Sequence, residues 1–173
     1  MRLPKQALIY RTLVTALLWL PVACTATYRV GSAVVTECDG QPCFAIINTP
    51  VMRNLNAVVV YDESTAPPSP TWVVGIDPTR ERKALTNCVS YGQTFSSQEV
   101  DQPAMALRIG QIYKVDLNAE PPDPTDPTHG YTARFCLVAQ SGSTNPSVRQ
   151  IIWNKRTGRW DDEVCGLHRH EKP

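Results

Sequence analysis

The chain has 173 residues, and its 17 lysines and arginines nearly balance its 16 aspartates and glutamates. Because these charges form no basic stripe, the composition argues against nucleic acid as a partner. The 15 prolines, together with β-branched and aromatic residues in short runs, argue against sustained helix and favour strands separated by loops.

The first 23 residues are typical of a secretory signal peptide. Arg2 and Lys5 form a basic start, the stretch 12–23 (TLVTALLWLPVA) is apolar, and no acidic residue precedes Cys24. That stretch is shorter than the roughly 20 residues that span a bilayer, and its basic flank favours export over a buried core helix. We therefore predict a signal helix over 1–23, whose removal leaves 14 basic and 16 acidic residues, a net charge of −2.

The residues around Cys24 indicate how the leader is removed. The segment Leu20-Pro21-Val22-Ala23-Cys24 resembles a bacterial lipobox, in which a small residue precedes a cysteine that becomes lipid-modified. Pro21 departs from that pattern, which has a leucine-like residue in its place, and the alternative is ordinary cleavage after Ala26. We expect lipidation of Cys24, a tether over 24–27, and anchoring at the periplasmic face of the outer membrane, because no aspartate follows the cysteine.

Short β-rich runs predict about eight strands in one domain over 28–166, followed by a disordered tail over 167–173. Apolar and polar residues alternate at 111–118 and 131–139, whereas the apolar run at 56–61 predicts a strand buried on both faces. The pair Asp39-Gly40 predicts a tight reversal. The expected strands cover 28–37, 43–48, 56–61, 71–76, 88–91, 111–118, 131–139, 148–154 and 159–165, with the last two forming a hairpin around 155–158.

This pattern predicts an all-β fold, a two-sheet β-sandwich of immunoglobulin-like type stapled by disulfides. The charged segment 77–87 is expected to form a loop or one helical turn. The proline-rich segment 120–130 (EPPDPTDPTHG) is expected to be a polar surface loop between two well-patterned strands.

Five cysteines follow Cys24, and disulfides are their default state in an oxidising compartment. Two bridges and one unpaired thiol are expected, and the spacing by itself leaves the pairing open. Cys38 is the odd residue: it would pair with Cys43, stay free and buried, or link two chains. A zinc site is the weaker interpretation, because Cys38 and Cys43 lack a second close pair.

Residues that carry chemistry are scarce. The sequence has three histidines, of which His168 and His170 belong to the charged tail, and it contains no nucleophile elbow, phosphate-binding loop or zinc-protease motif. Prolines between the loop acids also prevent the alternating spacing of a calcium loop. We therefore predict a protein that is not an enzyme, with no cofactor, no metal site and no small-molecule substrate.

Two polar segments are candidate contact surfaces for a protein partner, because charged and aromatic residues on loops of a rigid β scaffold suit recognition. One lies in the proline-rich loop and the other in the last predicted hairpin. A solvated surface is the alternative for both. The candidate partner-binding residues are Asp123, Asp126 and His129 in the loop, and Trp160, Asp161, Asp162 and Glu163 in the hairpin.

Four motifs occur in an order that resembles a known family. They are the segment 39–47 (DGQPCFAII), the segment 88–92 (CVSYG), the segment 110–115 (GQIYKV) and the segment 131–135 (YTARF). Over residues 30–140 the chain is similar to small periplasmic lipoproteins that serve as type VI secretion immunity proteins. It departs from them in the lipobox, in a longer insertion between Gly92 and Gly110, and in additional cysteines.

The resemblance implies a disulfide between Cys43 and Cys88, which leaves Cys136 and Cys165 as the second pair. It also implies a periplasmic lipoprotein that binds and neutralises a secreted antibacterial toxin, protecting the producing cell and its kin. Its partners would be the cognate toxin and, through the N-terminal lipid, a membrane. The alternative is a non-enzymatic lipoprotein that supports assembly of the envelope or of the secretion machine.

Overall fold

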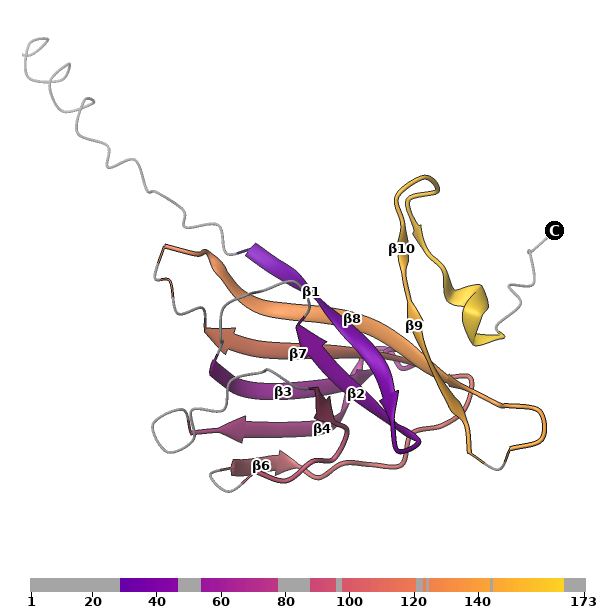
Figure 1. The fold of residues 1–173 in the computed structure, drawn as a ribbon, viewed down its shortest axis with the longest axis horizontal. Helices are drawn as coiled ribbons and strands as arrows, with labels where there is room; N and C mark the ends of the chain where they lie inside the picture. Colours follow the sequence, from indigo (N-terminus) through magenta and orange to yellow (C-terminus); the bar gives the residue numbers. More distant parts are fainter. Residues whose placement is uncertain are drawn as a thin grey trace, which may run out of the picture.

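The computed structural model describes residues 29–46, 54–77, 88–95, 98–120, 123, 125–143 and 145–166, and Figure 1 shows their arrangement. The predicted signal helix over 1–23, Cys24, the tether over 24–27, the segment 78–87 and the tail over 167–173 lie outside these residues. Within the described ranges, no helix has the length and apolar character needed to cross a bilayer.

The described chain is almost entirely β-strand, with a single short 3-10 helix near its end. The strands are β1 (Arg29–Cys38), β2 (Gln41–Ile46), β3 (Asn54–Asp62), β4 (Ser69–Ile76), β5 (Val89–Ser90), β6 (Gln98–Gln102), β7 (Ile112–Glu120), β8 (Thr128–Val138), β9 (Ser147–Ile151), β10 (Trp153–Asn154) and β11 (Arg159–Trp160), and the helix is η2 (Asp162–Cys165). The all-β expectation is confirmed, and every strand predicted between residues 28 and 139 is present with modest shifts at its ends.

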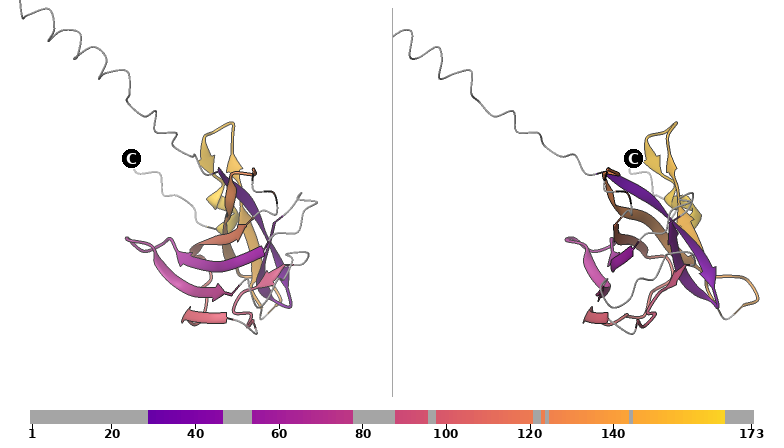
Figure 2. Two further views of the ribbon diagram at one scale, coloured as in Figure 1. Left: turned by 90° about the vertical axis from the view of Figure 1, so that its left-hand side faces the viewer. Right: turned by 60° about the vertical axis from the view of Figure 1, so that its left-hand side comes forward.

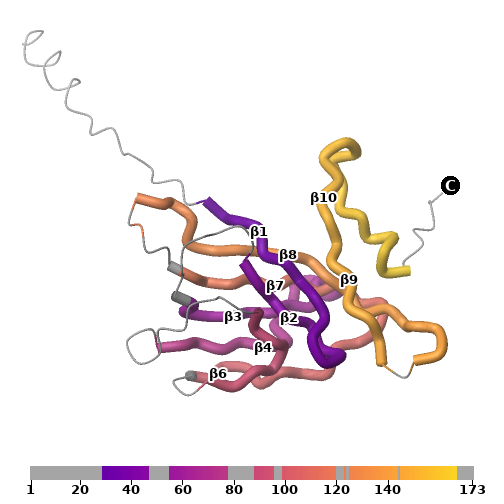
Figure 3. The backbone as a smooth tube through the Cα atoms, in the orientation of Figure 1, coloured from indigo at the N-terminus to yellow at the C-terminus, as the bar shows by residue number. Residues whose placement is uncertain are grey.

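Nine strands join in one curled sheet with the order β5-β2-β1-β8-β7-β3-β4-β6, and β9 pairs with β8 beside β1. Strand β1 runs parallel to β8 over Arg29–Ser32 and then pairs antiparallel with β2 from Ala33 onward. Figure 2 shows the result: β1 and β2 turn across the rest of the sheet instead of continuing its plane. The tube in Figure 3 shows β2 crossing over β7 and β3.

The reversal between β1 and β2 has the geometry that the Asp-Gly pair predicts. Cys38 pairs with Gln41, so the turn contains only Asp39 and Gly40, and both have positive φ (52° and 74°). This left-handed backbone suits the right-handed twist of the two strands, and asparagine, aspartate and glycine tolerate it best.

Close packing requires glycine at position 31 of β1, because a Cβ on Gly31 would lie 2.5 Å from the Tyr131 ring.

The main core fills the inside of the curl. Phe44 from β2 lies against Phe135 from β8, with ring centroids 5.5 Å apart, and Phe135 stacks on Tyr113 from β7 at the same distance. On the β4 side, the Tyr91 ring meets Trp72 edge to face at 5.4 Å. Burial raises the pKa of the Tyr91 hydroxyl. The alternation predicted for β7 and β8 is confirmed, because their inward residues are all buried: Tyr113, Val115, Leu117, Tyr131, Ala133, Phe135 and Leu137.

The prediction that 56–61 is buried on both faces is wrong. Val58 and Val60 are fully buried, but Ala57 and Val59 are only half-buried, because their face of the sheet is turned away from the core. Strand β6 was not predicted: its polar sequence QEVDQ belongs to an edge strand, where Glu99 and Val100 are exposed.

The prediction of one long hairpin from 148–154 and 159–165 is also wrong. Strand β9 pairs with β8, only the two-residue strands β10 and β11 pair with each other, and the chain then coils into η2. The coil brings Cys165 back to β8, which an extended strand leaving the turn does not do.

Two disulfides staple the fold. Cys43–Cys88 joins β2 to the residue before β5, and Cys136–Cys165 joins β8 to η2, with Cα–Cα distances of 5.4 and 5.9 Å. They join the same cysteines that the family resemblance pairs. With sequence separations of 45 and 29 residues, each contributes about 3–4 kcal/mol in the chain-entropy model. Cys38 is unpaired and, against the option of a buried free thiol, exposed.

Two neighbouring valines on β3 test which face of the sheet is the core. Val58→Ala removes methyl groups that are fully buried, so we expect the free energy of unfolding to fall by about 2 kcal/mol or more. Val59→Ala, on the opposite half-buried face, should lower it by less than half as much. Urea unfolding measures both, and equal losses would contradict the assignment of the faces.

Candidate functional site

The segment 152–166 leaves the sheet after β9, forms a small hairpin, and returns through η2 (Figure 1). Trp153 pairs with Trp160 and Asn154 with Arg159, which leaves 155–158 as the turn. The Asn154 side chain accepts hydrogen bonds from the backbone N–H groups of Arg156 and Thr157 at 3.0 and 3.2 Å. These bonds order the turn locally, as asparagine commonly does.

Both ends of this segment are tied to the outer face of the sheet. Ile151, the last residue of β9, packs with the Cys136–Cys165 disulfide in a small second core, and Trp160 covers part of it. This cluster lies on the face opposite Phe135, because Cys136 is the next residue along β8 and successive side chains alternate. The hairpin therefore projects from a base that is held at its entrance and at its exit.

An arginine on the same face of β8 supports the hairpin. The Arg134 guanidinium lies 4.7 Å from the centre of the Trp160 ring, a distance typical of a cation–π contact. It also forms an ion pair with Glu63: Nη2 donates a hydrogen bond to Oε1 at 3.0 Å, and Nε lies 2.8 Å from Oε2. Trp160 in turn meets Trp153 edge to face at 5.3 Å. This stack of Glu63, Arg134, Trp160 and Trp153 connects the residue that follows β3 to the projecting strands.

Large apolar side chains are exposed on this segment. Ile152 is 57% exposed, Trp153 45% and Val164 40%, although the neighbouring Ile151 and Cys165 are buried. An isolated exposed apolar residue is ordinary, but several on one projecting and well-anchored element are typical of a surface that another protein covers.

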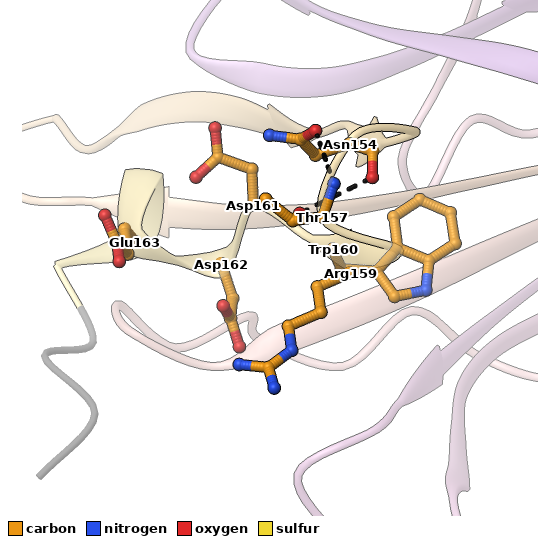
Figure 4. A pocket seen from close by; sticks show the side chains of 7 residues that line it. All are labelled: Asn154, Thr157, Arg159, Trp160, Asp161, Asp162 and Glu163. Atoms are coloured by element: carbon orange, nitrogen blue, oxygen red, sulfur yellow. Dashed lines mark hydrogen bonds between the residues drawn. The ribbon is translucent and has the colours of Figure 1, made fainter. Parts of the chain in front are cut away.

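A cleft of about 600 Å³ opens beside the hairpin. Figure 4 shows that the three acidic side chains lie on one side of it and the Trp160 ring on the other, with Arg159 between them. Asp161 and Glu163 are exposed, and Asp162 is half-buried. The lining residues are Asn154, Thr157, Arg159, Trp160, Asp161, Asp162 and Glu163. The structure thus brings together all four residues predicted from the last hairpin.

The other predicted surface is not part of this site. Asp123 accepts hydrogen bonds from the backbone N–H and the hydroxyl of Thr125 at 2.8 and 2.7 Å, and these bonds lower the pKa of its carboxyl. Asp126 accepts the N–H of Thr128 at 2.9 Å. His129 is exposed beside a shallow apolar pocket on the outer face. The loop precedes the first residue of β8, whereas the hairpin begins after Ile151, which pairs with Arg134 in the middle of β8.

The candidate residues named from the sequence omit several residues of the hairpin site, among them Ile152, Trp153, Glu63 and Arg134. Ile152 and Trp153 were assigned to an ordinary strand, so their exposure was not foreseen. Glu63 and Arg134 are 71 positions apart in the sequence, and no local pattern relates them. One signal for Trp153 is present in the sequence: Trp153 and Trp160 flank a polar turn, and aromatic residues often pair across the two strands of a hairpin.

Among the residues that the structure describes, no three histidine, cysteine or acidic side chains converge on a point where a metal could bind. What the hairpin offers is shape, apolar contact and charge, which are the means of protein recognition.

Comparisons of the chain with protein-family models, with curated proteins and with solved structures found no match.

Replacing Arg134 by lysine tests whether the stack holds the hairpin. Lysine keeps the charge but lacks the planar guanidinium, which contacts Glu63 and the Trp160 ring together. We expect Arg134→Lys to lower the free energy of unfolding by about 1–2 kcal/mol and to weaken the circular-dichroism signal that the coupled Trp153 and Trp160 rings produce.

Asp116→Asn is the matched control for Arg134→Lys. It removes the Lys114–Asp116 pair, whose two side chains are 35% and 38% exposed. Solvent screens such a pair, so the loss should stay below about 0.5 kcal/mol with the tryptophan signal unchanged. Equal effects of the two substitutions would show that Arg134 is an ordinary surface charge.

Proposed function

We propose that this protein is an exported immunity protein that binds and neutralises a secreted type VI antibacterial toxin in the periplasm. The observation that carries the proposal is the clamped hairpin, on which Ile152, Trp153 and Val164 remain exposed. Exposing apolar side chains to water is unfavourable, so a group of them on an ordered surface indicates a site where a partner buries them. The order of the four sequence motifs supports the toxin as that partner.

Neutralisation by occlusion needs no chemistry from the immunity protein. The hairpin would enter or cover the functional cleft of the toxin, and tight binding would then be sufficient. The disulfide at its base and the stack on Arg134 order the surface before it meets the toxin. A preorganised surface loses less conformational entropy on association, which favours high affinity.

The compartment and the finer description of the fold belong to the same proposal. The two disulfides suit an oxidising location such as the periplasm. We regard the β5-β2-β1 part of the sheet as the second layer of an immunoglobulin-like sandwich, since Phe44 packs over Phe135 as facing layers do. The scaffold would carry the hairpin outward from the outer membrane, where the lipid on Cys24 holds the chain.

The lipid can be tested directly. Mass spectrometry of the mature protein should find an N-terminal Cys24 carrying diacylglycerol and a further acyl chain. Cys24→Ser should leave export intact but move the protein from the membrane fraction to the soluble periplasm, because the lipid is the proposed anchor. A mature chain that begins at Thr27 would show ordinary cleavage after Ala26 and contradict anchoring.

The binding surface is tested with sister-cell competition and with the purified product of a neighbouring gene that encodes an exported toxin; absence of such a gene would contradict the proposal. Deleting the gene should make cells sensitive to wild-type sisters, and the wild-type chain should restore resistance. Trp153→Ala should weaken toxin binding at least about 30-fold, because a central tryptophan is often worth 2 kcal/mol or more. Ile152→Ser serves as a second variant, since Ile152 takes no part in the tryptophan stack.

Met105→Ala is the control, because Met105 is 53% exposed but lies outside the hairpin, and it should bind the toxin as the wild type does. Full resistance of the deletion strain, or unchanged binding by both hairpin variants, would contradict the proposal. Recovery of several secretion-machine components in place of one toxin would favour the assembly role instead.

A further inference from the structure

Charges of opposite sign are sorted along the hairpin. Lys155 and Arg156 lie at the turn, and Asp161 and Glu163 lie where the chain returns to the sheet; all four are exposed. Within the described part of the chain, no ion pair involves any of them. Four charges are thus available to a partner, and they form a basic tip and an acidic base.

The two charged ends act separately on a partner. A strand advances about 3.4 Å per residue, so the tip and the base are roughly 10–15 Å apart. The Debye length is about 8 Å at physiological ionic strength, which screens each end from the other. A partner surface of one sign would be attracted by one end and repelled by the other, and would gain little from these charges.

The apolar contact lies between the two ends. Trp153 pairs with Trp160 halfway along the hairpin, beyond the acidic residues and below the turn. The exposed Arg159 lies between the charged ends as well, and the half-buried Asp162 belongs to the acidic base; both line the cleft that Figure 4 shows. A partner that covers Trp153 must therefore approach the basic tip and the acidic base together.

We propose that the partner surface is two-signed: an acidic patch meets Lys155 and Arg156, a basic patch meets Asp161 and Glu163, and an apolar contact for Trp153 lies between the patches. This rests on the proposed function, because it describes the toxin surface that the hairpin binds. Charge order then fixes the direction in which the hairpin docks and speeds capture of the correct partner.

Charge reversals test the proposed polarity. The probe is the same purified toxin that tests the proposed function, and the quantity measured is the association rate constant at low and at high salt. The variant K155E/R156E reverses the tip, and D161K/E163K reverses the base. Each should slow association about tenfold or more at low salt, and the difference from wild type should shrink as salt is added.

A combined variant separates polarity from net charge. K155E/R156E/D161K/E163K has the same net charge as the wild type but the opposite order along the hairpin, so it should associate most slowly of all. Two control variants change exposed charges elsewhere by matching amounts: R29E/R108E and E99K/D101K. Both should associate within about twofold of the wild type, because their charges lie outside the hairpin, at the start of β1, before β7 and on the edge strand β6.

The outcomes distinguish the inference from the function on which it rests. If one reversal slows association and the other accelerates it, the partner has a single sign; the polarity is then wrong, and the toxin-binding function stands. Unchanged rates for both reversals, with binding still lost in Trp153→Ala, would overturn the polarity in the same way. Absence of any binding by the wild-type chain would overturn both.

Discussion

The first residues of β8 hydrogen-bond to β1 and its last residues to β9, so one edge of this strand serves two partners. Because both cannot occupy the same place, β1 turns away after Ser32 and takes β2 with it across the core. The Gln150 side chain of β9 bridges the space between β9 and the diverging part of β1: it accepts a hydrogen bond from the Val35 N–H at 3.0 Å and donates one to the Ala33 carbonyl at 3.3 Å. The curl of the sheet follows from this division.

The same strand also positions the candidate site. Successive side chains of a strand point to opposite faces, so Phe135 enters the main core while Arg134 and Cys136 emerge on the outer face. Arg134 lies against Trp160, and Cys136 bonds to Cys165. Strand β8 thus contributes to the core through one face and holds the hairpin through the other, so the proposed recognition surface is fixed to the sheet.

The motifs behind the family resemblance describe this framework and not the surface. Tyr91 fills the space beside Trp72, its hydroxyl donates to the carbonyl of Met105 at 2.8 Å, and Tyr113 accepts the N–H of Arg108 at 2.8 Å. Tyr131 and Phe135 are buried. Residues of this kind determine how a chain folds. The exposed hairpin lies outside the matched stretch, which is why the resemblance points to a function without indicating a binding residue.

The sequence by itself determined what depends on near neighbours: the alternation of β7 and β8, the Asp39-Gly40 turn, the turn at 155–158, and the polar and aromatic residues 160–163 that line the cleft. Tertiary structure alone decided the contacts between distant residues. Arg134 pairs with Glu63, 71 positions away in the sequence. Strand β9 pairs with β8 and not with the segment that follows it in the chain. Trp153 is exposed although the local sequence pattern is that of a half-buried strand. The physical reason is that local patterns record which face of a strand is apolar, whereas pairing and exposure depend on which other strand arrives beside it.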